Sequence, residues 1–81
     1  MAGFLPEEIR TGKMRVVLVG NGEALVEQHR GLISYETEEI VFRMLKGQVR
    51  LQGEGMVIAS FGAMDARVEG KIKGVFLEAE A

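Results

Sequence analysis

The sequence predicts an all-β domain of about seven or eight short antiparallel strands, arranged as a sandwich, a roll or a small barrel. Two observations lead to this fold class. Short apolar runs rich in β-branched residues recur about every eight to twelve residues, and glycine separates most of them. The 81 residues also include 11 glycines and one proline, about twice the ordinary glycine usage of ~7%, which indicates many tight turns. A chain of this length has room for a single hydrophobic core.

The first half of the chain contains four predicted strands. Residues 14–19 are apolar on both faces, which is typical of a covered strand. The glycines and asparagine of 20–22 tolerate positive φ and favour a tight turn, from which 24–28 returns as the second strand. The third strand covers 32–35. The fourth covers 40–45, with Ile40, Phe42 and Met44 on one face and Arg43 on the other.

The clearest alternation in the chain follows, in the fifth predicted strand. Val49 and Leu51 are apolar, and the residues on either side of them are polar. Because successive side chains of a strand point to opposite faces, Val49 and Leu51 are predicted to face inward. Their polar neighbours are predicted to face water: Gln48, Arg50 and Gln52.

The remaining predicted strands are an almost uncharged one at 56–60 and a last pair, 66–69 and 71–77, separated at Gly70. Helix is expected for at most one turn, at 6–10, where a proline and two acidic residues suit the start of a helix. We therefore divide the chain into a lead segment (1–13), one all-β domain (14–78) and an acidic tail (79–81).

Composition excludes several classes of function. Twelve acidic and ten basic residues give a net charge of -2, so bulk charge favours binding neither to nucleic acid nor to an anionic membrane. The absence of cysteine excludes disulfides, thiolate nucleophiles and cysteine-based metal sites. We expect no nucleic-acid partner and no cofactor. No segment has the pattern of a signal peptide or the length of a transmembrane helix.

His29 is the only histidine and therefore the first candidate for catalysis. It would act as a general base if Ser34 or Ser60 were a nucleophile and Asp65 its orienting carboxylate, but nothing in the spacing favours such a triad. As a metal ligand it would depend on scattered carboxylates. We expect a structural turn in which His29 or Arg30 hydrogen-bonds neighbouring carbonyl or carboxylate groups.

Three acidic residues, Glu36, Glu38 and Glu39, form a polar turn after the third predicted strand. Carboxylates in a loop can bind a divalent cation, although a solvated loop is the simpler interpretation. An alternative function therefore makes this loop and His29 the centre of a small ligand-binding or enzymatic site.

The segment 56–64 is apolar and has no charge before Asp65. This is the composition of an ordinary core strand, and also that of a strand that pairs with another chain when it is exposed. Domains of this size are often stabilised by oligomerisation. We expect a homo-oligomer, with these candidate interface residues: Met56, Val57, Ile58 and Ala59.

A sequence motif surrounds the histidine. Residues 26–35 contain Glu27, then His29, Arg30 and Gly31, then two aliphatic residues and, after one intervening residue, an aromatic one. This order resembles the pattern E-x-H-R-G-[LI]-[IL]-x-[YF] of the YabP/YqfC family of sporulation proteins, and of its YqfC branch in particular.

Three further segments agree with the family in the same order. Residues 17–23 are similar to its first strand and turn, 51–58 to L-x-G-[ED]-x-[LMF]-x-I, and 68–72 to [VL]-E-G-x-I. The resemblance extends over nearly the whole chain. The motif residues in these later segments are Gly53, Glu69 and Gly70.

The resemblance implies a function that the residues alone do not reveal. It implies a small non-catalytic protein of endospore-forming bacteria, made in the mother cell during sporulation. It further implies a cytoplasmic protein located peripherally at the forespore envelope, with a membrane protein of the sporulation programme as its partner. It implies neither a cofactor nor a catalytic residue.

Overall fold

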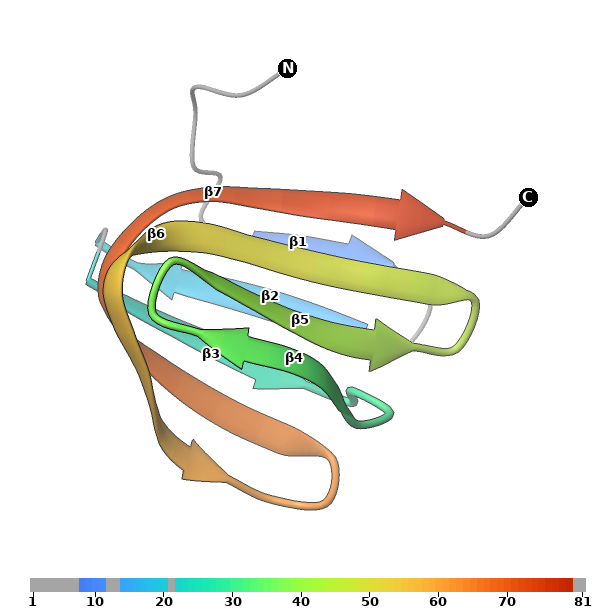
Figure 1. The fold of residues 1–81 in the computed structure, drawn as a ribbon. Coiled ribbons are helices and arrows are strands. Elements are labelled where there is room, and N and C mark those ends of the chain that lie inside the picture. Colours follow the sequence, from blue (N-terminus) through green and yellow to red (C-terminus); the bar gives the residue numbers. More distant parts are fainter. Residues whose placement is uncertain (1–7, 12–13, 21, 80–81) are drawn as a thin grey trace.

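The computed structural model describes residues 8–11, 14–20 and 22–79. These residues form seven β-strands and no helix (Figure 1), which confirms the predicted all-β class. The strands are β1 (Glu8–Thr11), β2 (Met14–Val19), β3 (Glu23–Glu27), β4 (Leu32–Glu36), β5 (Glu39–Met44), β6 (Gly47–Phe61) and β7 (Asp65–Ala79).

All seven strands belong to one antiparallel sheet with the order β1-β2-β3-β7-β6-β5-β4. The two strands of 15 residues, β6 and β7, bend sharply together and fold the sheet over on itself (Figure 1). The first half of β6 pairs with β5 and with the second half of β7, whereas its second half pairs with the first half of β7, beside β3. The fold is therefore an open roll of two layers, with β1 and β4 at the two ends of the sheet.

Glycines make the bend possible. A β-carbon at Gly53 would overlap the carbonyl oxygen of Lys71, and one at Gly70 would lie 2.7 Å from the carbonyl oxygen of Gly55. Gly70 has a φ of 136°, which residues with side chains rarely adopt. The β6–β7 ladder shifts register on both sides of this region. The glycines that the sequence predicts as turns at 53–55 and Gly70 are thus bends within continuous strands, and each long strand replaces two predicted ones.

The N-terminal strand β1 corrects the prediction of a helical turn at 6–10. The described part of that segment pairs antiparallel with β2, from Glu8 opposite Val17 to Thr11 opposite Met14. A single helical turn gains little, because few hydrogen bonds offset the cost of its nucleation, whereas pairing with a strand satisfies backbone groups along the segment. Residues 6 and 7 lie outside the described residues.

The core fills the space between the two layers. Val49 and Leu51 are fully buried, which confirms their predicted inward orientation. The buried cluster consists of Met14, Val16, Leu18, Ala24, Val26, Ile40, Phe42, Met44, Val49, Leu51, Met56, Ala66, Val68 and Ile72.

The opposite face of β6 is less exposed than the alternation predicts. Gln48, Arg50 and Gln52 are only half-exposed. The side-chain amide of Gln48 donates to the Glu78 carboxylate at 2.6 Å, and the Arg50 guanidinium lies 5.4 Å from the centre of the Phe76 ring. Long side chains on this outer face therefore cover one another.

Candidate functional site

The motif segment His29, Arg30 and Gly31 crosses from β3 in one layer to β4 in the other, and its backbone bonds to both sides. The His29 N–H donates to the Met64 carbonyl at 3.0 Å, in the loop between β6 and β7. The Arg30 N–H donates to the Arg43 carbonyl at 2.7 Å, and the Arg43 N–H donates to the Gly31 carbonyl at 2.8 Å. The crossover therefore ties the β6–β7 loop to β5.

The His29 side chain lies in the interior, 1% exposed. Its Nδ1 accepts the Gly31 N–H at 2.9 Å, and its Nε2 lies 3.2 Å from the backbone carbonyl oxygen of Asp65. A carbonyl oxygen only accepts, so Nε2 carries the proton. The ring lies between Phe42 and Phe61, with centroid distances of 5.2 and 5.1 Å. Both nitrogens are engaged inside the fold, which leaves no lone pair of His29 for a metal ion or for proton transfer in this arrangement.

The acidic turn and His29 do not come together. Glu36 and Glu38 are exposed, while Glu39 forms an ion pair with Arg50 at 3.3 Å. The turn follows the end of β4, and His29 precedes its start. The five residues of β4 span about 16 Å at a rise of ~3.3 Å per residue. The two features of the alternative site therefore lie at opposite ends of β4.

The later motif residues lie at the bend of the sheet. Gly53 and Gly70 allow β6 and β7 to approach closely there, and the Gly70 N–H donates to the Gly22 carbonyl at 3.1 Å. Glu69 precedes Gly70, and its carboxylate forms an ion pair with Arg67. The bend thus brings β6 and β7 together through backbone contacts that a β-carbon at Gly53 or Gly70 would obstruct, and it bonds to the turn before β3.

The candidate interface at 56–59 lies only partly at the surface. Met56 is fully buried, because it points into the core after the bend, so it is not available for an interface in the folded chain. Ile58 packs against the core, and its N–H donates to the Tyr35 hydroxyl at 2.9 Å. Val57 and Ala59 are exposed. The second half of β6 has β7 on one side and is partly covered by Tyr35 of β4 on the other.

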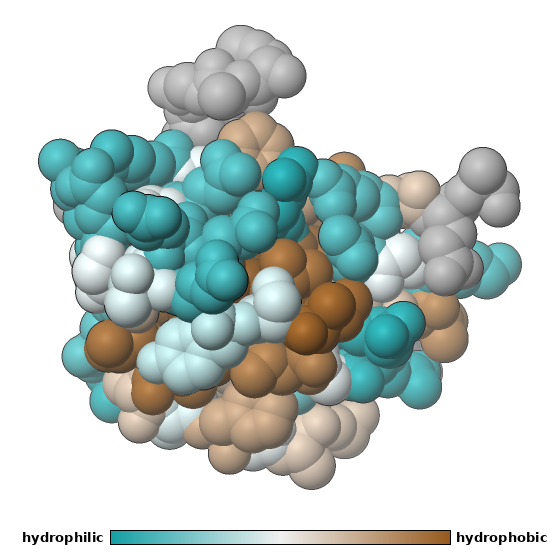
Figure 2. Space-filling model, in the orientation of Figure 1, coloured by the Kyte–Doolittle hydropathy of each residue, from teal (hydrophilic) through white to brown (hydrophobic). Residues whose placement is uncertain are grey.

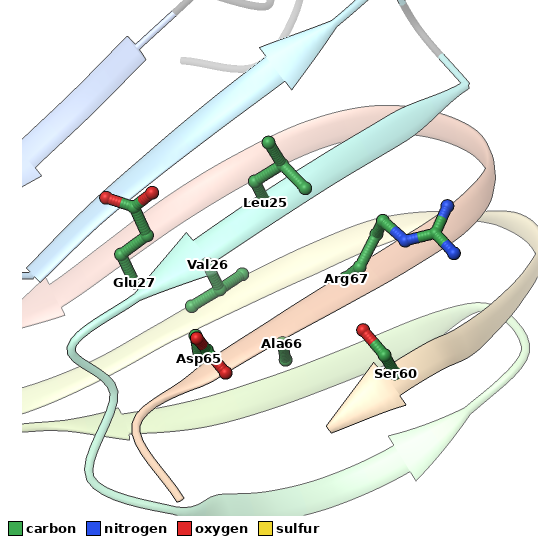
Figure 3. A pocket seen from close by; sticks show the side chains of 7 residues that line it. All are labelled: Leu25, Val26, Glu27, Ser60, Asp65, Ala66 and Arg67. Carbon is green, nitrogen blue, oxygen red and sulfur yellow. The ribbon is translucent and has the colours of Figure 1, made fainter. Parts of the chain in front are cut away.

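A hollow of about 210 Å³ lies between β3, β6 and β7 (Figure 3). Its lining residues are Leu25, Val26, Glu27, Ser60, Asp65, Ala66 and Arg67. The Arg67 guanidinium is already ion-paired with Glu23, at 3.3 Å, and with Glu69. Sequence analysis missed this hollow because its residues come from three strands whose pairing no local pattern reveals.

Apolar side chains gather over β4 and the adjoining β6–β7 hairpin (Figure 2). Five large hydrophobic side chains of β4 and of the second half of β6 are exposed: Leu32, Ile33, Tyr35, Val57 and Phe61. Within residues 8–11, 14–20 and 22–79, by contrast, no group of three or more metal-binding side chains is assembled. In the same part of the chain, no helix has the length and apolarity needed to cross a membrane.

These observations define a class: a small β-sheet domain whose motif residues build its crossover and its bend, and whose apolar side chains are exposed along one end of the sheet. The chain belongs to the YabP family, whose model matches residues 10–81. This confirms the resemblance that the motif indicates. Membership points to a sporulation-related protein, and the YabP family is not a known enzyme family.

One curated relative supports the same relationship. The chain is 26% identical over 68 residues to a Bacillus subtilis (strain 168) protein described as "Uncharacterized protein YqfC", and the matched region covers 84% of this chain and 73% of that protein. No solved structure matches the chain.

Proposed function

We propose that this chain is a non-catalytic structural or interaction module of endospore formation, which acts in the mother cell at the forespore envelope. It works as a homo-oligomer and binds a membrane protein of the sporulation programme. Family membership supports the link to sporulation. The arrangement around His29 carries the non-catalytic part of the proposal.

Both nitrogens of the His29 imidazole already have hydrogen-bond partners inside the fold. A general base or a metal ligand needs an accessible nitrogen lone pair. Here Nδ1 accepts from the Gly31 backbone, Nε2 donates to the Asp65 backbone, and two phenylalanine rings flank the imidazole. The most distinctive residue of the motif thus acts in the architecture of the crossover, and the surface is left to supply the function.

The exposed apolar surface supports a function in binding another protein. Exposed apolar side chains occur on β4 and on the second half of β6, which lie on the same side of the roll and are joined by the bond from the Ile58 N–H to the Tyr35 hydroxyl. Contiguous apolar surface on a small domain commonly marks a contact with another protein.

A fluorescent fusion expressed from its own promoter in sporulating cells tests the proposal. We expect fluorescence in the mother cell, concentrated around the forespore, and a loss of heat-resistant spores when the gene is deleted. Uniform fluorescence in vegetative cells, with normal spores after deletion, would refute the sporulation role.

The variant His29→Gln tests the proposal that the protein is not a catalyst. We expect His29→Gln to lower the melting temperature of the purified protein and to reduce spore formation only in proportion to the folded protein remaining. A variant with an unchanged melt and no spores would instead assign His29 a chemical or partner-binding role.

A further inference from the structure

Strand β4 is an end of the sheet that is poorly protected against pairing. It bonds to β5 on one side only and therefore presents unpaired backbone N–H and C=O groups on the other. Natural edge strands are commonly blocked by lysine, proline, an inward-pointing charge or a β-bulge. Between Leu32 and Tyr35, β4 has no lysine, proline or charged residue, and it exposes Leu32, Ile33 and Tyr35 by 38%, 41% and 47%. Its single irregularity is a register shift between Leu32 and Ser34.

Charges of opposite sign flank this apolar edge. Arg30 and Arg43 are exposed beside the start of β4, and Glu36 and Glu38 are exposed at its end. None of these four side chains has an ion-pair partner among the described residues. The strand therefore runs from an unneutralised basic end through an apolar centre to an unneutralised acidic end.

Such an edge is complementary to itself in one orientation. If two β4 strands pair antiparallel about a two-fold axis near Ile33 and Ser34, Arg30 of one copy meets the Glu36 to Glu38 turn of the other, and the symmetry repeats the contact. The apolar side chains meet at the centre. In a parallel arrangement, each charged end would meet its own kind.

We infer that β4 is the interface between two copies of this chain, which pair edge to edge so that one sheet continues across the dimer. The occupant is a second copy because a two-fold axis satisfies the charge order twice, whereas a different antiparallel partner would need the same basic-to-acidic order in its own sequence. The inference deepens the proposed function and rests on its premise that the chain acts by assembly.

A charge swap tests the inference on the purified full chain, with sedimentation equilibrium as the measurement. Arg30→Glu places glutamate opposite glutamate, and Glu38→Arg places arginine opposite arginine, twice in each dimer. We expect each variant to raise the dimer dissociation constant by about tenfold or more. The double variant Arg30→Glu/Glu38→Arg restores the opposite charges and returns the constant to within about threefold of the wild-type value.

Mixing the two single variants is the most specific test, because only complementary charges at this edge would let them associate. The Arg30→Glu chain has glutamate at both 30 and 38 and the Glu38→Arg chain has arginine at both, so opposite charges meet at each of these contacts and a mixture of the two monomeric variants forms a 1:1 heterodimer. Ile33→Lys, which puts a charge in the middle of the edge, keeps the chain monomeric. Lys46→Glu is the matched control, because Lys46 lies on the β5–β6 turn beyond β5, and it leaves the dimer intact. Circular dichroism melts verify that every variant is folded.

Two results would overturn the inference. One is a wild-type chain that stays monomeric at the highest soluble concentration, whatever partner it captures. The other is a dimer whose dissociation constant is the same in the wild type and in both single variants, and whose variants do not associate on mixing. The interface would then lie elsewhere. Either result leaves the proposed sporulation role standing, because localisation and spore counts test that role separately.

Discussion

Replacing Gly70 by alanine tests the physical basis of the bend. Two costs add at this position. The φ of 136° lies in a region that residues with a β-carbon rarely adopt, which costs about 1–3 kcal/mol. The new β-carbon would also lie 2.7 Å from both the Gly55 carbonyl oxygen and the Met56 Cα. These are backbone atoms, so no side-chain rotation relieves the contact.

The magnitude follows from these two costs. Crowding of a packed region by one carbon costs about 1–3 kcal/mol, so we expect Gly70→Ala to lower the free energy of unfolding by about 2–6 kcal/mol in total. A domain of this length has roughly 4–12 kcal/mol of stability, at ~0.05–0.15 kcal/mol per residue. The variant should therefore be at the margin of folding.

Gly55→Ala is the matched control. Gly55 also has a positive φ, of 60°, but nothing lies within 4 Å of a β-carbon built there. Only the left-handed conformation is penalised, at about 1–2 kcal/mol. Urea unfolding followed by circular dichroism measures both variants. If Gly70→Ala were no more destabilising than Gly55→Ala, the close approach of β6 and β7 would not explain the glycine.

Three further predictions concern the core, the crossover and one surface carboxylate. Leu51→Asp should unfold the domain, because an unpaired carboxylate in the fully buried site costs several kcal/mol; an unchanged thermal melt would contradict the burial. Gly31→Val should destabilise more than His29→Gln in urea unfolding, because Gly31 has a φ of 124° that a β-branched residue resists; the reverse order would show that the imidazole bonds dominate. The hydrogen bond and charge of Lys73 hold the pKa of Glu54 below its ordinary value of 4.5, so the stabilising contact is complete above that pH and is lost as the pH falls through the lowered pKa. Lys73→Gln should raise the Glu54 pKa in an NMR titration, and an unmoved pKa would exclude Lys73 as the cause.

Features set by local alternation were predictable from the sequence. Val49 and Leu51 face the core as predicted, because the period of a strand decides which residues share a face. Register shifts break that period in the second half of β6, and there Met56, one of the candidate interface residues, is buried.

Features that depend on distant pairing were not predictable in the same way. Glycine permits both a turn and a close backbone approach, so Gly53 and Gly70 could be distinguished from turns only once β6 and β7 were known to lie side by side. The same limit applies to β1, where pairing with β2 overrides a local preference for helix. The motif identified His29 as a residue of interest, but its two backbone partners come from the fold.

The passage of β6 and β7 through both layers has a consequence for how the chain folds. A loop of only three residues, 62–64, joins the two strands. Closing this short loop has a small entropic cost, so the two strands can pair progressively from the loop outward. Pairing of β3 with β7 instead joins Glu27 to Asp65 and Glu23 to Glu69, which requires a much longer loop and should come later. Because the hairpin belongs to both layers, neither layer can open as an independent unit while the other stays intact. In the monomer, amide hydrogen exchange should accordingly be slowest along the hairpin and fastest at β1 and β4, so that the strands at the two ends of the sheet fray first.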